Sequence, residues 1–145
     1  RIQRRSIAEA SSIRGAFKHG RLCPLRDLPR IDLVIVGSVA VSRDGIRIGK
    51  GGGYSEIEYG ILRELNLIEE ETPVFTSIHD LQLIDEAPKE EHDLTVDLIS
   101  TPRRIIRIRR KQPQPKGIFW RELSERRLHE MPILLELKKI LHERS

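Results

Sequence analysis

The chain has 145 residues, of which 38% are hydrophobic and 33% are charged. This composition is typical of a globular protein with a hydrophobic core and excludes a disordered chain. The longest aliphatic run, residues 33–36, is far too short to cross a membrane, so we expect no membrane partner. A single cysteine, Cys23, excludes an internal disulfide and a thiolate metal cluster. Because it also favours a reducing compartment, we expect a cytoplasmic protein.

The net charge of +4 is distributed unevenly. Residues 1–30 and 100–117 are basic, whereas residues 56–97 carry thirteen carboxylates and only two basic side chains. Basic blocks attract nucleic acids or phosphorylated small molecules, or they form a solvated surface. For the cluster from Arg103 to Lys111, pairing with the acidic stretch and binding to phosphate both remain open. No aromatic residue interleaves this cluster, which argues against stacking on nucleic-acid bases.

The predicted elements alternate between helices and strands. In chain order they are a helix over 6–20, a connector over 21–30, an extended segment over 31–42, a turn over 42–45, a short extended piece over 46–49, a helix over 55–68, strands over 72–78, 94–101 and 104–110, a loop over 111–117 and a helix over 121–142. This alternation predicts an α/β fold with a mostly parallel sheet.

Several local signals support these assignments. Ser6, with Glu9 three residues later, predicts a capped helix start. Residues 31–42 form a nearly continuous β-branched run, which predicts a strand buried on both faces, interrupted at Gly37. Pro132 predicts a break or kink in the last helix.

Four glycines fall within residues 49–53, directly before the second long helix. Glycine lets backbone N–H groups approach a phosphate, a helix N-terminus adds partial positive charge, and Lys50 adds a formal charge. The dinucleotide fingerprint does not fit, because Tyr54 stands where its third glycine belongs. The Walker A pattern does not fit either, because Gly51 follows Lys50 in place of Ser or Thr. On spacing alone, a structural turn and a phosphate site are equally open.

The stretch RIGKGGGY, with an acid two places on, closely resembles the signature R-L-G-x-G-x-G-Y-Y-D of the 5-formyltetrahydrofolate cyclo-ligase (methenyltetrahydrofolate synthetase) family. The resemblance covers residues 31–102, through DLVIVGSVAVSRDG before the loop and LQLIDEAPKEEHDLTVDLISTP after it. The tail, with PKGIFW and MPIL, resembles a divergent branch, the methenyltetrahydrofolate synthetase domain-containing proteins.

The resemblance implies a three-layer α/β/α fold like that of the ribose-5-phosphate isomerase and CoA-transferase group. It also implies a ligase of one-carbon metabolism that uses ATP and Mg²⁺. In that reaction, ATP phosphorylates the formyl oxygen of 5-formyltetrahydrofolate, the ring nitrogen attacks, and phosphate leaves to give 5,10-methenyltetrahydrofolate. Positioning and charge stabilisation are the main catalytic needs. The alternative is a non-catalytic protein that binds nucleotide or RNA on the same scaffold.

The resemblance also assigns residues. The ATP-binding loop falls on Gly49, Lys50, Gly51, Gly52, Gly53 and Tyr54. Lys50 and Tyr54 are also the positions that approach the folate in relatives, so the resemblance makes them substrate-binding and catalytic candidates. Lysine supplies a point charge for phosphate or a folate tail, and tyrosine supplies a ring face and a hydroxyl. Glu56 and Asp93 fall on the magnesium-linked acids, and carboxylate oxygens suit Mg²⁺.

The sequence departs from the family pattern after Tyr54. The usual Tyr-Asp-Arg reads Ser55-Glu56-Ile57, so the acid reaches one methylene further and a positive charge is lost. These changes favour the binding alternative, whereas the intact loop and the block around Asp93 favour the enzyme.

We predict one domain over 1–145, with a helix and connector over 1–30 and a cyclo-ligase-like core with a C-terminal helix over 31–145. The family's N-terminal half has no counterpart here, and the chain opens without methionine. We therefore expect it to be the C-terminal part of a cyclo-ligase-like domain, which would not turn over alone.

Other chemical candidates have plainer interpretations. His79 is expected to pack or to form hydrogen bonds, since no second ligand stands at metal-binding spacing. Ser38 lacks the second glycine of a nucleophile elbow, so we expect it to form hydrogen bonds with the backbone. Phe119 and Trp120 are expected to belong to the core.

Overall fold

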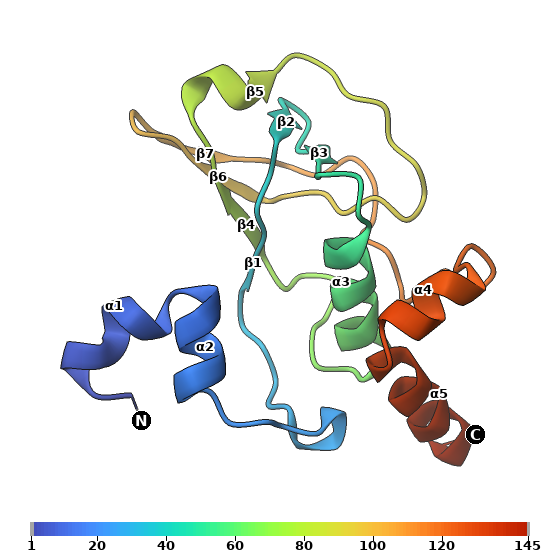
Figure 1. Ribbon diagram of the computed structural model, residues 1–145. Helices are drawn as coiled ribbons and strands as arrows, with labels where there is room; N and C mark the ends of the chain where they lie inside the picture. The colour runs from blue at the N-terminus through green and yellow to red at the C-terminus, as the bar shows by residue number, and fades with distance from the viewer. Residues whose placement is uncertain (1, 145) are drawn as a thin grey trace.

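The computed structural model describes residues 2–144, and its centre consists of two small β-sheets (Figure 1). The four-stranded sheet has the order β1-β4-β6-β7, and the three-stranded sheet has the order β3-β2-β5. The strands are β1 (Val34–Ile35), β2 (Ala40–Ser42), β3 (Arg47–Ile48), β4 (Val74–Ser77), β5 (Leu83–Ile84), β6 (Leu98–Ser100) and β7 (Ile105–Arg107).

Helices precede, connect and follow these strands. The α-helices are α1 (Ile7–Ala10), α2 (Ile13–His19), α3 (Tyr54–Glu64), α4 (Glu125–Glu130) and α5 (Ile133–Arg144), and the 3₁₀ helices are η1 (Arg4–Ser6), η2 (Leu25–Asp27) and η3 (Asp80–Gln82). In the view of Figure 1, α1 and α2 lie to one side of β1, and α3, α4 and α5 lie to the other. No helix between residues 2 and 144 combines the length and the apolar character needed to cross a membrane.

The strand pairing is mostly parallel. Strand β4 pairs in parallel with β1 and with β6, and β2 pairs in parallel with β5. Antiparallel pairs join β2 to β3 and β6 to β7. The predicted α/β fold with a mostly parallel sheet is therefore confirmed, and the arrangement is consistent with three α/β/α layers.

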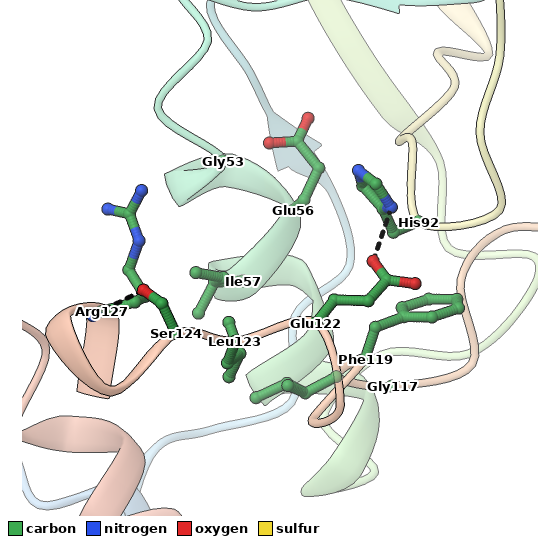
Figure 2. Close-up of a pocket in the computed structure, with 11 residues that line it drawn as sticks. Gly53, Glu56, Ile57, His92, Gly117, Phe119, Glu122, Leu123, Ser124 and Arg127 are labelled. Atoms are coloured by element: carbon green, nitrogen blue, oxygen red, sulfur yellow. Dashed lines mark hydrogen bonds and ion pairs between the residues drawn. The ribbon is translucent and has the colours of Figure 1, made fainter.

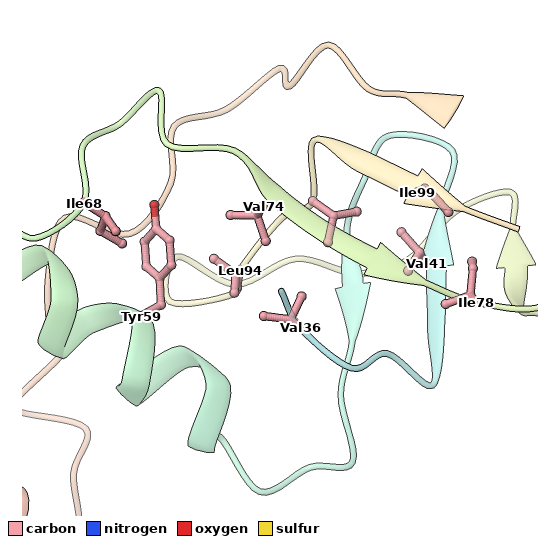
Figure 3. Packing of buried hydrophobic residues seen from close by; sticks show 9 residues of the cluster. Val36, Val41, Tyr59, Ile68, Val74, Ile78, Leu94 and Ile99 are labelled. Carbon is pink, nitrogen blue, oxygen red and sulfur yellow. The ribbon is translucent and has the colours of Figure 1, made fainter. Parts of the chain in front are cut away.

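Two hydrophobic clusters meet at α3. The first cluster lies between the sheets and α3, and it includes Tyr59, Val74 and Ile99 (Figure 3). The second cluster joins α3 to α5 and to η2; its buried members are Leu25, Ile57, Ile61, Leu65, Leu134, Leu137 and Ile140. Ile57 and Ile61 are one helical turn apart and so share a face of α3 that Tyr59 does not share. Helix α3 is therefore packed on two sides.

The segment over residues 31–42 differs from the prediction of one strand buried on both faces. It forms two short strands, β1 and β2, which belong to different sheets and are separated by residues 36–39. Ile35 is 68% exposed, although it lies in register with Phe75 of the neighbouring strand β4. A β-branched run favours extended backbone, but burial depends on what packs against each face.

The predicted N-terminal helix is interrupted. Residues 7–19 form α1 and α2, which are separated by Ser11 and Ser12. Ser6 makes no capping hydrogen bond, contrary to the prediction, whereas the Ser12 hydroxyl accepts from the N–H of Gly15 at 3.0 Å. Helix α1 still begins directly after Ser6, but only the second helix, α2, begins with a serine side-chain cap.

The C-terminal helix breaks next to Pro132, as predicted, but begins later than residue 121. Helix α4 starts at Glu125, because the Ser124 hydroxyl accepts from the N–H of Arg127 at 3.2 Å. The strands predicted over 72–78, 94–101 and 104–110 are present in shortened form, and residues 111–117 are a loop, as predicted.

Candidate functional site

The glycine loop connects β3 to α3 and adopts backbone conformations that glycine tolerates best. Gly51 has φ +79° and Gly53 has φ +64°. A Cβ atom built on either residue would have no neighbour within 4 Å. Glycine is therefore required at these two positions by the backbone and not by lack of space.

The N-terminus of α3 can receive an anion. The N–H group of Ile57 donates to the carbonyl of Gly53 at 3.1 Å, which closes the first helical turn. Within residues 2–144, the N–H groups of Tyr54, Ser55 and Glu56 have no acceptor, and Gly53 offers no side-chain cap. Free N–H groups and the helix dipole both favour negative charge at this end.

The loop lines an open cavity of about 700 Å³. Every site residue predicted from the sequence lies on its wall: Gly49, Lys50, Gly51, Gly52, Gly53, Tyr54, Glu56 and Asp93. Lys50 and Tyr54 are exposed at the cavity, and Gly37 and Ser38 also line it. The structure thus brings these residues together around a space of the size that small-molecule ligands occupy. Their individual roles stay predictions.

Arg47 is a part of this site that the sequence analysis missed. Its side chain is buried below the loop, where Nε donates to the carbonyl of Gly37 at 2.9 Å and Nη2 donates to the Ser55 hydroxyl at 3.1 Å. It also forms an ion pair with Glu56. The guanidinium therefore joins β3, the β1–β2 turn and the first turn of α3. The signal was present, because Arg47 is the first residue of RIGKGGGY.

The two predicted magnesium ligands have protein partners. Glu56 pairs with Arg47, and the Asp93 carboxylate accepts from the N–H of Glu90 at 2.7 Å. No group of three or more His, Cys, Asp or Glu side chains suited to a metal ion occurs in the described chain from residue 2 to 144. Two carboxylates on one cavity wall suit an ion held mainly by phosphates and water, as Mg²⁺ commonly is. They do not form a cage made by protein alone.

Two titratable groups that interact electrostatically with Glu56 or Asp93 have shifted pKa values. Burial raises the pKa of Glu58, and the negative charge of Glu56 raises it further. Burial lowers the pKa of Lys89, although the nearby Asp93 carboxylate acts in the opposite direction. In both cases burial favours the uncharged form, because the charged form loses part of its hydration shell.

The family model described as the 5-formyltetrahydrofolate cyclo-ligase family matches residues 12–102, which include the whole glycine loop, Glu56 and Asp93. The chain belongs to the 5-formyltetrahydrofolate cyclo-ligase family. The resemblance read from RIGKGGGY is therefore confirmed. The departures Ser55-Glu56-Ile57 now have a structural explanation. Ser55 and Glu56 bind Arg47, and Ile57 is buried in the second cluster.

Similar proteins include both the domain-containing branch and a cyclo-ligase. The chain is 48% identical over 110 residues to a human protein named methenyltetrahydrofolate synthase domain-containing protein, a match that covers 74% of this chain and 29% of the relative. The zebrafish protein of that name is 44% identical over 121 residues, covering 82% and 32%. A 5-formyltetrahydrofolate cyclo-ligase of Mycolicibacterium smegmatis is 31% identical over 83 residues, covering 57% and 40%. The chain thus spans less than half the length of these relatives.

A second, smaller cavity of about 270 Å³ adjoins the loop of this cyclo-ligase family member (Figure 2). Gly53, Glu56 and His92 line both cavities. The rest of its wall comes from Ile57 and from the segment over residues 117–127. The sequence analysis did not place this segment at the site, because spacing along the chain contains no signal for a contact across sixty residues.

The remaining candidates have structural partners. The His79 ring accepts from the N–H of Leu81 at 3.2 Å and caps η3, so its predicted hydrogen-bonding role is confirmed. The Ser38 hydroxyl bonds to the Thr76 hydroxyl at 2.8 Å, a side chain in place of the predicted backbone partner. Trp120 packs against the second cluster, as predicted. Phe119 was also expected in the core, but it belongs to neither cluster and lines the smaller cavity.

The basic cluster is partly neutralised by the acidic stretch. Arg110 donates to Asp97 at 2.6 Å and to Glu70 at 2.7 Å, and Arg103 lies 3.7 Å from Asp80. The predicted pairing is therefore confirmed for two members of the cluster. Three further members are exposed: Arg104, Arg107 and Arg109.

Proposed function

We propose that the protein carrying this sequence binds ATP on the glycine loop and cyclises 5-formyltetrahydrofolate to 5,10-methenyltetrahydrofolate, or catalyses a closely related reaction. The observation that carries this proposal is the position of the loop. Its residues, Lys50 among them, lie at the N-terminus of α3 beside three free N–H groups, and they line one cavity together with Glu56 and Asp93. Membership of a ligase family supports the same conclusion.

The proposed roles follow from the chemistry of each group. The loop N–H groups and Lys50 bind the nucleotide phosphates and stabilise the charge that develops on the transferring phosphoryl group. Tyr54, which is half exposed at the cavity, orients the reduced folate through its ring and hydroxyl. Glu56 and Asp93 would hold a phosphate-bound Mg²⁺, which neutralises phosphate charge when present. Arg47 positions Glu56 through their ion pair.

The proposal is tested with the protein that carries this sequence, ATP, Mg²⁺ and 5-formyltetrahydrofolate, by following the absorbance of the methenyl product. Lys50→Ala is expected to lower kcat/KM by about 100-fold, since a group that stabilises transition-state charge typically contributes about that much. Lys139→Ala is the matched control, because Lys139 is exposed on α5, far from the loop in sequence. ATP-independent product, or equal rates for the two variants, would contradict the proposed roles.

The acid at position 56 needs its own control. Glu56→Gln is expected to raise the Mg²⁺ concentration for half-maximal rate, whereas Glu71→Gln, at an exposed position outside the cavity, is not. Because Glu56 also pairs with Arg47, the unfolding midpoint of each variant is measured alongside. A lower midpoint with an unchanged Mg²⁺ dependence would assign Glu56 to structure alone.

A second candidate function has one specific observation in its favour. The Glu56 carboxylate is already paired with the buried Arg47, which reduces its availability to a metal ion. A protein that binds nucleotide or RNA without cyclo-ligase chemistry would tolerate this pairing. Calorimetric binding of ATP or RNA together with a complete absence of methenyl product would favour this candidate.

A further inference from the structure

The smaller cavity is built largely by residues outside the family match. The match ends at residue 102, yet the segment over 117–127 supplies Phe119, Glu122, Leu123 and Arg127 to the cavity wall. Figure 2 shows Leu123 and Arg127 on the side of Ile57 and Gly53, at the start of α3, and Glu122 pointing toward His92. The core of the family and the C-terminal segment therefore share one site, and the segment closes the side of the loop that leads toward α4.

The segment is held firmly in place. The N–H of Ile118 donates to the Glu64 carboxylate at 3.2 Å, and the indole N–H of Trp120 donates to the same oxygen at 3.3 Å. A Cβ atom on Gly60 would meet the Ile118 side chain at 2.8 Å, so the segment lies directly on α3. A wall fixed in this way loses little entropy when a ligand binds.

The wall has apolar faces and a polar edge. Phe119 packs edge-on against the His92 ring with 6.0 Å between centroids, and apolar side chains from Ile57 and Leu123 face the same space. The Glu122 carboxylate lies 3.0 Å from Nδ1 of His92 and remains half exposed. Aromatic and aliphatic faces favour a flat ring, and a carboxylate accepts from N–H groups on the edge of such a ring.

Arg127 connects this wall to the glycine loop. Its guanidinium stacks over the Tyr54 ring at 4.6 Å from the centroid. Tyr54 and Gly53 belong to the loop, so a ligand that reaches from the loop into the smaller cavity passes along this pair.

We propose that the smaller cavity is a compartment for a planar nitrogen heterocycle, either the purine of a nucleotide or the pterin of a reduced folate. Phe119 provides its ring wall and Glu122 accepts from the edge of the heterocycle. The inference rests on the proposed function, because it extends the same site. The proposal assigns recognition of the heterocycle to the segment over residues 117–127, and phosphate binding to the glycine loop.

Calorimetric titration of the whole chain with Mg²⁺-tripolyphosphate, Mg²⁺-ATP and 5-formyltetrahydrofolate tests this compartment. Phe119→Ala is expected to weaken binding of at least one ring-bearing ligand by about tenfold, because ring stacking on an aromatic side chain is worth about that much. Tripolyphosphate, which has no ring, should bind the variant as it binds the parent. Loss confined to ATP identifies the purine, and loss confined to the folate identifies the pterin.

A second site variant and a control variant complete the test. Glu122→Gln, at an exposed position, keeps the fold if Phe119→Ala disturbs it, and is expected to weaken the same ligand several-fold. Phe17→Ala, on the exposed helix α2, is the matched control and should change nothing.

Ring ligands that bind both site variants as tightly as the parent, or bind the parent no better than tripolyphosphate, would overturn the compartment. If the compartment is overturned but methenyl product still forms, the proposed reaction remains supported and only the ring compartment is rejected. If Phe119→Ala weakens ATP binding but no product forms with the parent, the compartment stands and the ligase does not.

Discussion

Two pairs of helices, one near each end of the chain, have similar sequence patterns and different environments. In α5, the apolar residues Leu134 and Leu137 are completely buried in the second cluster, and Leu128 of α4 packs against it. In α1 and α2, Ile13 is 81% exposed and Phe17 is 88% exposed. Every hydrogen bond and ion pair recorded for residues 2–20 ends within that segment, and Figure 1 shows α1 and α2 apart from the other helices.

The comparison teaches that an apolar stripe on a helix does not by itself mean that the stripe is buried. Helix α5 finds a complementary stripe on α3, formed by Ile57 and Ile61, so its leucines gain burial. Helices α1 and α2 are instead tied to each other by surface charge. The Glu9 carboxylate accepts from Lys18 at 2.6 Å, which together with His19 lowers the pKa of Glu9. Such exposed pairs contribute little to stability.

The largest expected difference comes from truncating one apolar side chain in each pair. Leu137→Ala is expected to reduce the free energy of unfolding by about 2–5 kcal/mol, because it leaves a cavity in the second cluster. Phe17→Ala should change it by less than about 0.5 kcal/mol. Urea denaturation followed by circular dichroism measures both. A similar loss for Phe17→Ala would mean that α2 packs on the body of the protein in solution.

Substituting one glycine in α1–α2 and one in α3 tests whether the two regions unfold independently. Gly60→Ala brings a methyl group to 2.8 Å from Ile118, and this overpacking is expected to cost about 1–3 kcal/mol in global unfolding. Gly15→Ala would bring Cβ to 1.7 Å from the Glu9 carbonyl oxygen, so α1 and α2 must separate. Hydrogen exchange should then show lost protection within residues 7–19 while the global midpoint stays the same. A shifted midpoint would contradict the independence of α1 and α2.

The buried Tyr59 hydroxyl makes the stability of the first cluster depend on pH. Its hydroxyl is buried without a hydrogen-bond partner in the described chain, and burial raises its pKa to about 12. Because the folded state holds this proton more tightly than the unfolded state, stability falls as pH rises past the unfolded pKa. The loss should reach about 1.4 kcal/mol by about pH 11, which corresponds to one pKa unit. Tyr59→Phe should remove this loss, and Tyr54→Phe, at an exposed position, should retain it.

The smallest expected effect concerns the two serine caps. Ser124→Ala removes the cap of α4 and should lower the free energy of unfolding by about 1 kcal/mol, because α4 is part of the packed C-terminal pair. Ser12→Ala removes the equivalent cap of α2 and should reduce helix content without moving the midpoint. Equal shifts of the midpoint in denaturation experiments would show that both pairs unfold with the core.

The sequence predicted the part of the candidate site whose residues follow one another in the chain. Residues 49–54 form a loop because glycine at 51 and 53 permits positive φ, and the helix that follows depends on the spacing of Ile57 and Ile61. Arg47 was missed as a buried partner of Glu56: the motif RIGKGGGY begins with it, but a motif does not show whether a charged strand residue is buried. The resemblance to a known family added Asp93, which no local pattern would have placed beside the loop.

The sequence by itself determined most of the alternation of helices and strands, the glycine loop and the membership of the cyclo-ligase family, because these depend on backbone preferences and on short motifs. It did not show the split of residues 31–42 into β1 and β2, nor strand β5. Only the tertiary structure decided which apolar faces are buried and that Glu56 pairs with Arg47. It also decided that Phe119 lines the smaller cavity and that Arg127 stacks on Tyr54 of the loop. Those contacts join residues far apart in the chain. They are selected by the total free energy of packing, which no short stretch of sequence contains.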